Sequence, residues 1–166
     1  VISFPDVAGS DVRYAALLDG SSLDFGDAEV VLYDVRGYGT VKGSAVTLAG
    51  DIHPGGEGAV GTITFASAPV IAEGAKLVSE FDGISGDRLE IAGGDFSLGD
   101  LALDFRMLGN ARGMGSTTLV SASTGAITGE FTSIVKSPRR AERTTITYGE
   151  NKTVLVFRQG TVIRIR

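Results

Sequence analysis

The sequence predicts an all-β fold, and within that class it favours a β-solenoid over a sandwich or a barrel. The chain of 166 residues holds 24 glycines against 4 prolines, and Gly, Asn or Asp separates nearly all of its short apolar segments. Many segments are only three or four residues long and meet at a single glycine corner, as in DRLEIAGGDFSLGDLALDF (87–105). Because sandwich strands are usually longer and joined by hairpin turns, the short strands favour a stack of coils, with a β-sandwich as the alternative.

Alternation with a period of two residues predicts about a dozen strands along the chain. In the first two thirds we expect Ser22–Phe25, Glu29–Asp34, Ala45–Leu48, Thr62–Phe65, Ala75–Glu80, Arg88–Ile91, Phe96–Leu98 and Leu101–Phe105. In the last third we expect Thr117–Ser121, Ile127–Ile134, Thr144–Tyr148, Thr153–Phe157 and Thr161–Ile165.

The length suits one continuous domain. An apolar stripe containing Ala15 and Leu18 predicts a short helical turn over Ser10–Leu18. Residues 1–45 are expected to form an N-terminal cap or the first coils, and residues 46–166 the coils with their closing strands. Comparable apolar pairs recur at roughly 20 residues, a spacing too irregular to define the repeat.

Composition argues against several classes of function. The net charge is −5 and the isoelectric point is near 4.8, which argues against nucleic-acid binding. Without cysteine, disulfides and thiolate metal sites are impossible. No stretch approaches the roughly 18 apolar residues of a membrane helix, so no membrane insertion is expected.

The stretch HPGGEGAVGTITF (53–65) contains the G-x-G-x-x-G spacing of a dinucleotide-binding turn, in Gly56, Gly58 and Gly61. That motif requires a helix directly after the glycines, so that its first amides hold a pyrophosphate. Here Thr62–Phe65 follows, and its β-branched alternation is typical of a strand. We therefore expect a turn between two strands, and no cofactor.

Candidate metal ligands are few. His53 is the only histidine, and its place before Pro54 in a glycine-rich turn predicts a solvated side chain. Its uniqueness excludes metal sites built from several His and Cys side chains. The segment GGDFSLGDL (93–101) resembles a calcium-binding glycine roll, but the order of Asp95 and Phe96 is wrong and the nonapeptide does not recur. We expect a plain glycine corner there.

Paired carboxylates for polysaccharide cleavage would come from acids along one exposed sheet. The candidates are Glu80, Asp82, Asp87, Glu90, Asp100 and Asp104. No histidine accompanies them, and the chain has no tryptophan to stack on sugar rings. We therefore expect solvated faces and corner caps, and a protein that is not an enzyme.

Basic residues gather near the C-terminus, where KSPRRAER (136–143) is the sharpest charged feature. Its Ser-Pro break predicts an exposed loop, either solvated or in contact with an acidic partner such as a neighbouring copy. The segment TVIRIR (161–166) alternates apolar and basic residues. We expect it either to block edge-to-edge pairing through its charges or to add as a strand to a neighbouring chain, where VISFP (1–5) could be its pairing partner. The residues expected to take part in self-association are Lys136, Arg139, Arg140, Arg143, Val162, Ile163, Arg164, Ile165 and Arg166.

Four segments, in order, resemble the end portion of autotransporter-type passenger domains and autotransporter-associated β-strand repeat proteins. They are PGGEGAVGTITF (54–65), GAKLVSEFDG (74–83), GDRLEIAGGDFSLGDLALDF (86–105) and STTLVSASTGAITGEF (116–131). The matching positions are Pro54, Gly61, Thr62, Glu80, Asp87, Leu89, Gly93, Gly94, Leu119, Val120, Ile127, Gly129 and Phe131. Because TTITYGENKTVLVF (144–157) is similar to the last family strands, the resemblance covers residues 45–157.

The resemblance implies a right-handed parallel β-helix that is exported and displayed on or outside a bacterial cell. We expect a non-catalytic structural or adhesive protein that assembles end to end into a fibre or surface array. Its expected partners are copies of itself or the rest of a larger surface protein. Two alternatives stay open: a glycan-binding or polysaccharide-degrading module on the same scaffold, and the capping fragment of a larger adhesin.

Overall fold

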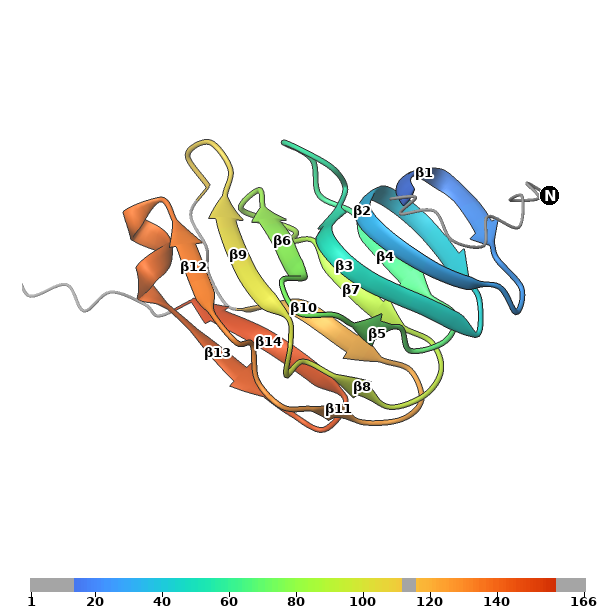
Figure 1. Cartoon of the computed structure of the whole chain (residues 1–166). Helices are drawn as coiled ribbons and strands as arrows, with labels where there is room; N and C mark the ends of the chain where they lie inside the picture. Colours follow the sequence, from blue (N-terminus) through green and yellow to red (C-terminus); the bar gives the residue numbers. More distant parts are fainter. Residues whose placement is uncertain (1–13, 112–115, 158–166) are drawn as a thin grey trace, which may run out of the picture.

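The protein folds into one large curled β-sheet, which confirms the all-β prediction (Figure 1). The computed structural model describes residues 14–111 and 116–157. Within these ranges the only helix is a short 3-10 segment, η1 (Arg139–Arg143). The fold therefore depends on sheet pairing and on the core that the sheet encloses.

The strands follow one another along the chain with few residues between them. The first seven are β1 (Tyr14–Asp24), β2 (Glu29–Lys42), β3 (Ala45–Pro54), β4 (Thr62–Phe65), β5 (Val70–Ile71), β6 (Lys76–Phe81) and β7 (Arg88–Ile91). The others are β8 (Phe96–Ser97), β9 (Ala102–Met107), β10 (Ser116–Ala122), β11 (Ile127–Thr128), β12 (Ile134–Ser137), β13 (Thr144–Tyr148) and β14 (Lys152–Phe157).

The large sheet has two arms that meet at β2. The first arm runs β3-β6-β9-β12 and the second arm runs β4-β7-β10-β14-β13. The chain alternates between the arms, so neighbours within an arm are not consecutive in sequence. The small strands β8 and β11 pair with each other outside this sheet, along the lower margin in Figure 1. One apolar cluster draws its members from both arms, so the core lies between them.

The described strands pair almost entirely in parallel. Only β14 pairs antiparallel, with β10 and with β13; the other strand pairs are parallel. Parallel neighbours need a crossover connection between them. This pattern differs from the antiparallel sheets of a typical β-sandwich.

Partner strands follow one another at matching sequence offsets in both arms. Between β4 and β7, and between β6 and β9, the offset is 26 positions; the pairs are Ile63 with Leu89, and Leu77 with Leu103. At the next step the offset is 31 positions in three places; the pairs are Leu103 with Ile134, Leu89 with Val120, and Phe96 with Ile127. These spacings are longer than the roughly 20 residues expected from the apolar pattern.

The matched offsets place apolar side chains beside one another in the core. On the second arm Ile63, Leu89 and Val120 lie in line on successive strands, and all three are fully buried. Because parallel strands keep their side chains in register, each strand adds one layer to the same core.

Several expected strands differ in their bounds and β5 was not expected, but two expected elements differ more deeply from the structure. The helical turn expected over Ser10–Leu18 is wrong where it is described, because residues 14–18 belong to β1 and pair with β2; cross-strand pairing outweighs a weak local stripe. The strand expected over Ile127–Ile134 is divided into β11 and β12. Gly129 has a φ of 74°, a left-handed conformation that ends β11 and starts a corner.

The basic segment 136–143 is not simply a loop. It contains the end of β12 and all of η1, because residues 134–137 pair in parallel with β9. The expected strand Thr161–Ile165 and the segment VISFP lie outside the described residues.

Candidate functional site

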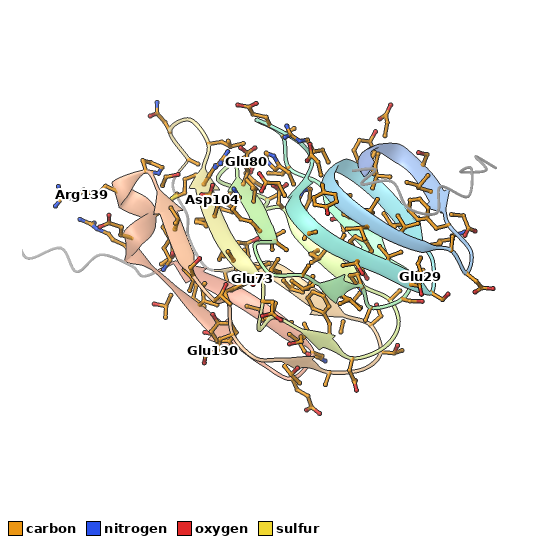
Figure 2. The ribbon with its side chains drawn as sticks, viewed as in Figure 1. Glu29, Glu73, Glu80, Asp104, Glu130 and Arg139 are labelled. Carbon is orange, nitrogen blue, oxygen red and sulfur yellow. The ribbon has the colours of Figure 1, made fainter. Side chains whose placement is uncertain are left out.

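The glycine-rich turn at 54–61, between β3 and β4, folds back over the outer face of β6. Alternation along β6 points Leu77 and Phe81 into the core and Glu80 to the opposite face. Glu80 is nevertheless buried, at 2% exposure, and its Oε2 accepts a hydrogen bond from the Gly58 N–H at 2.7 Å. Figure 2 shows Glu80 at the upper end of β6, close to this turn.

Asp87, directly before β7, ties the same turn to β6. Its Oδ1 accepts the Gly61 N–H at 2.7 Å and its Oδ2 accepts the Glu80 N–H at 2.8 Å. The second and third glycines of the G-x-G-x-x-G sequence thus donate to carboxylates of the protein itself. The expected turn between two strands is confirmed, and these two amides already have anionic partners.

His53 lies near the end of β3, beside the same pair of acids. It is buried, at 5% exposure, so the expectation of a solvated turn histidine is wrong; the folded-back turn covers it. Its Nε2 lies 3.7 Å from Glu80 Oε1 and has no hydrogen-bond partner in the described part of the chain. The structure therefore gathers one imidazole and two carboxylates in a buried site.

Burial dominates the protonation of this site. Burial raises the pKa of Asp87 to about 7. Hydrogen bonds from the Glu80 and Gly61 amides lower this pKa, and the negative charge of Glu80 raises it by a smaller amount. Burial also lowers the pKa of His53, while the Glu80 carboxylate opposes that shift. The site changes its charge near neutral pH.

The nearest arginines are held by acids of their own. Arg36 pairs with Asp34 at 2.8 Å and Arg106 pairs with Asp104 at 2.6 Å, each across two positions of one strand. Neither forms an ion pair with Glu80 or Asp87 in the described structure. The buried acids therefore have His53 as their only paired base within those residues.

The sequence reasoning named Glu80, Asp87 and His53 separately but missed their association. The histidine count excludes a site made of several imidazoles, whereas it leaves open a mixed site of one histidine and two acids. One local signal was present: Glu80 stands inside the otherwise mostly apolar strand KLVSEF, where an unpaired charge is unfavourable. The ligand atoms of the three residues all lie within 4.8 Å of one another.

The other candidate acids serve local structure. Asp82 caps its own turn by accepting the N–H groups of Ile84 and Ser85, each at 2.8 Å. Glu90 and Asp104 pair with arginines two positions away, and Asp100 is exposed.

The glycine corner at 93–101 is fixed to the next corner by the side chain of its own Asp95. Asp95 accepts the Ala126 N–H at 2.9 Å, so it joins this corner to the one before β11.

The basic residues near the C-terminus are only partly placed. Lys136 is half-buried and donates to the Thr144 carbonyl at 2.9 Å, while Arg139 and Arg143 are exposed on η1. The Arg140 side chain and residues 162–166 lie outside what the structure describes, and these include Val162, Ile163, Arg164, Ile165 and Arg166.

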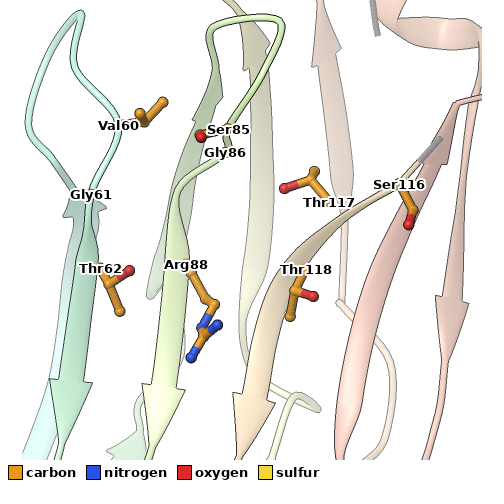
Figure 3. A pocket seen from close by; sticks show the side chains of 9 residues that line it. All are labelled: Val60, Gly61, Thr62, Ser85, Gly86, Arg88, Ser116, Thr117 and Thr118. Atoms are coloured by element: carbon orange, nitrogen blue, oxygen red, sulfur yellow. The ribbon is translucent and has the colours of Figure 1, made fainter. Parts of the chain in front are cut away.

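A shallow polar groove of about 500 Å³ crosses the outer face of the second arm. Figure 3 shows Thr62, Arg88 and Thr118 side by side on β4, β7 and β10. Its lining is completed by Val60, Gly61, Ser85, Gly86, Ser116 and Thr117. Neither Glu80 nor Asp87 lines it, so the groove and the buried site are separate features.

Comparison with protein-family models, curated proteins and solved structures found no match to this chain. Among the described residues no helix has both the length and the apolar character needed to cross a bilayer.

We expect Gly55→Ala to destabilise the protein far more than Gly56→Ala. Both glycines have a left-handed φ, 80° and 78°, so each substitution costs about 1 kcal/mol in backbone conformation. A Cβ at Gly55 would also lie 2.1 Å from the Ala59 carbonyl oxygen, whereas a Cβ at Gly56 meets no heavy atom within 4 Å. Thermal unfolding of the two variants measures the difference, and equal melting temperatures would contradict this packing of the turn.

A second expectation concerns pH. The pKa of Asp87 is about 7 in the folded state against 3.8 for an unperturbed carboxyl, so the folded state binds the extra proton between these values. The contribution of Asp87 to stability is therefore fully present below pH 4 and is lost as the pH rises to 7. In chelating buffer, the free energy of unfolding of the wild type, relative to that of Asp87→Asn, should rise by up to about 1.4 kcal/mol for each pH unit as the pH falls. Urea unfolding across this range tests it; a pH-independent difference would show that Asp87 keeps an ordinary pKa.

Proposed function

We propose that this chain is part of a right-handed parallel β-helix that serves as a rigid, non-catalytic structural or adhesive element outside a bacterial cell. The observation that carries the proposal is the common offset of 31 positions in three strand pairs, two in the large sheet and one in the small sheet of β8 and β11. In a β-helix every strand of a coil is displaced from its counterpart by the length of one coil. Unrelated parallel pairings have no reason to share one offset.

The order of elements supports the same reading. The strands β6, β7 and β8 make one circuit, and β9, β10 and β11 make the next, each strand pairing with its counterpart. After β12 the chain forms η1 and then the antiparallel strands β13 and β14, of which β14 pairs with β10. A switch from parallel to antiparallel pairing ends the repetition of coils, as expected of a closing hairpin.

A stack of coils exposes backbone and side chains at its ends, which other chains can use for pairing. On the described edge strand β12, Ile134 and Val135 are 42% and 59% exposed. Arg139 and Arg143 lie nearby on η1, while the chain as a whole carries a charge of −5. We infer that a second copy, or another part of a larger surface protein, docks at this end through apolar contact and charge attraction.

We expect the purified protein to form stacked oligomers or fibres that dissociate as salt is raised. Light scattering and negative-stain microscopy at increasing salt measure this, because screening weakens contacts between opposite charges. The double variant Arg139→Glu and Arg143→Glu should remain monomeric, while Lys42→Glu, an exposed charge reversal on β2, should assemble like the wild type. A strict monomer at high protein concentration would contradict the assembly.

A second candidate function is the binding of an anionic glycan in the polar groove. The Arg88 side chain is 40% exposed and lines this groove, and its Nη2 contacts Glu90 Oε2 at 2.7 Å. Hydroxyl groups from Thr62, Thr117 and Thr118 line the same groove. A guanidinium flanked by hydroxyl groups suits a carboxylate-bearing sugar.

We expect polygalacturonate, but not a neutral glucan, to raise the melting temperature. Arg88→Gln should remove this shift. Arg36→Gln should retain it, because Arg36 forms a comparable surface ion pair on β2 and does not line the groove. A shift that persists in Arg88→Gln would place any glycan elsewhere.

A further inference from the structure

We propose that His53, Glu80 and Asp87 bind a divalent transition-metal ion of the zinc class, which fastens the glycine-rich turn to β3 and β6. This inference goes beyond the structural role proposed above and does not depend on it. It stands on the placement of three buried side chains that come from β3, from β6 and from the residue preceding β7.

The spacing of the ligand atoms suits a single ion. One atom from each residue lies within 4.8 Å of the others, and His53 Nε2 lies 3.7 Å from Glu80 Oε1. Ligands at about 2.0–2.1 Å from a tetrahedral zinc ion are about 3.3 Å apart. Side-chain movements of about 1 Å would bring all three into the coordination sphere, with a fourth position left for water.

The imidazole supplies an independent indication. The His53 side chain is 6% exposed, and its Nε2 has no hydrogen-bond partner in the described structure. A buried polar atom without a partner is costly, and native proteins rarely keep one. Coordination of a metal through Nε2 would satisfy it.

The two carboxylates are already oriented for such a role. Backbone N–H groups of Gly58, Gly61 and Glu80 hold their oxygens in place. A carboxylate offers about four lone-pair positions, so each acid retains acceptor capacity after these bonds. Amides that hold metal-binding side chains in position are a common feature of metal sites.

Charge favours a cation at this point. Two acids are buried together, and the arginines nearby are paired with Asp34 and Asp104. The burial of two carboxylates in their charged form is unfavourable even with amide hydrogen bonds, and a divalent ion would neutralise both acids.

The ligand set selects the class of metal. Imidazole nitrogen suits zinc, cobalt, nickel and copper, whereas calcium and magnesium prefer sites built from oxygen. Calcium also needs six to eight ligands, more than three side chains supply. One nitrogen and two carboxylates therefore favour Zn²⁺, with Co²⁺ as a spectroscopic substitute.

The first experiment uses the unmodified chain. Because the protein has one histidine, its imidazole ¹⁵N signals need no assignment. Addition of ZnCl₂ to the metal-free protein should shift the Nε2 resonance and saturate at one ion per chain, with a rise in melting temperature that EDTA reverses. An imidazole spectrum unchanged at saturating Zn²⁺ would overturn the proposal without any substitution.

Variants then test the individual side chains. His53→Gln and Glu80→Gln should each weaken Zn²⁺ binding at least 100-fold in calorimetric titration and abolish the thermal shift. The matched control is Asp51→Asn, a half-exposed acid on β3 that pairs with Lys76, and it should bind like the wild type. Binding that survives unchanged in both site variants would place the ion elsewhere and reject this site.

Discussion

Parallel pairing in register is the constraint on which the rest of the structure depends. In a parallel ladder each residue lies beside its counterpart on the next strand, and a slip of one residue would turn the apolar face outward. The apolar positions must therefore recur where the next strand pairs, as they do from Ile63 to Leu89, 26 positions on, and from Leu89 to Val120, 31 positions on. The corners must also fit on one another. A Cβ at Gly125 would lie 2.4 Å from the Gly94 carbonyl oxygen, so only glycine permits the close approach of these two corners.

The folded-back turn is a local departure from this regular plan, and it creates the buried site. A turn that simply joined the two arms would leave the outer face of β6 in water, as β9 leaves Arg106 and Asp104 partly exposed. Residues 54–61 instead cover Glu80 and His53, and the covering backbone needs acceptors for its own N–H groups. Glu80 and Asp87 provide them. The glycines thus have the property expected of an anion-binding turn, that is, amides available to an anion, but the anions belong to the same chain.

The sequence was informative where structure is local and misleading where it is not. The bounds of β4, β7 and β13 agree with the expected strands, because alternation between turn residues determines them directly. The segment around Ala16 has no such clear alternation, and its pairing with β2 decided its conformation. The burial of His53 was out of reach, since it depends on a turn folding over a later strand, with Gly58 bonding to Glu80 across 22 positions. The expectation of solvated acids is wrong for Glu80 and Asp87, which are buried at 2% and 0% exposure. Glu80 could have been recognised, because an acid within an apolar strand by itself indicates a buried partner.

The position of the buried site within the repeat indicates a role other than the stacking of coils. A feature required by coil stacking should recur at each step, as the apolar line of the second arm does. The register partner of Glu80 on the next strand is Arg106, a base whose side chain is 39% exposed and paired with Asp104. Within the described residues the imidazole and its two acids occur together at one level only. Stacking of the strands does not require two buried carboxylates there, and a cation shared among the three side chains accounts for both their burial and their single occurrence.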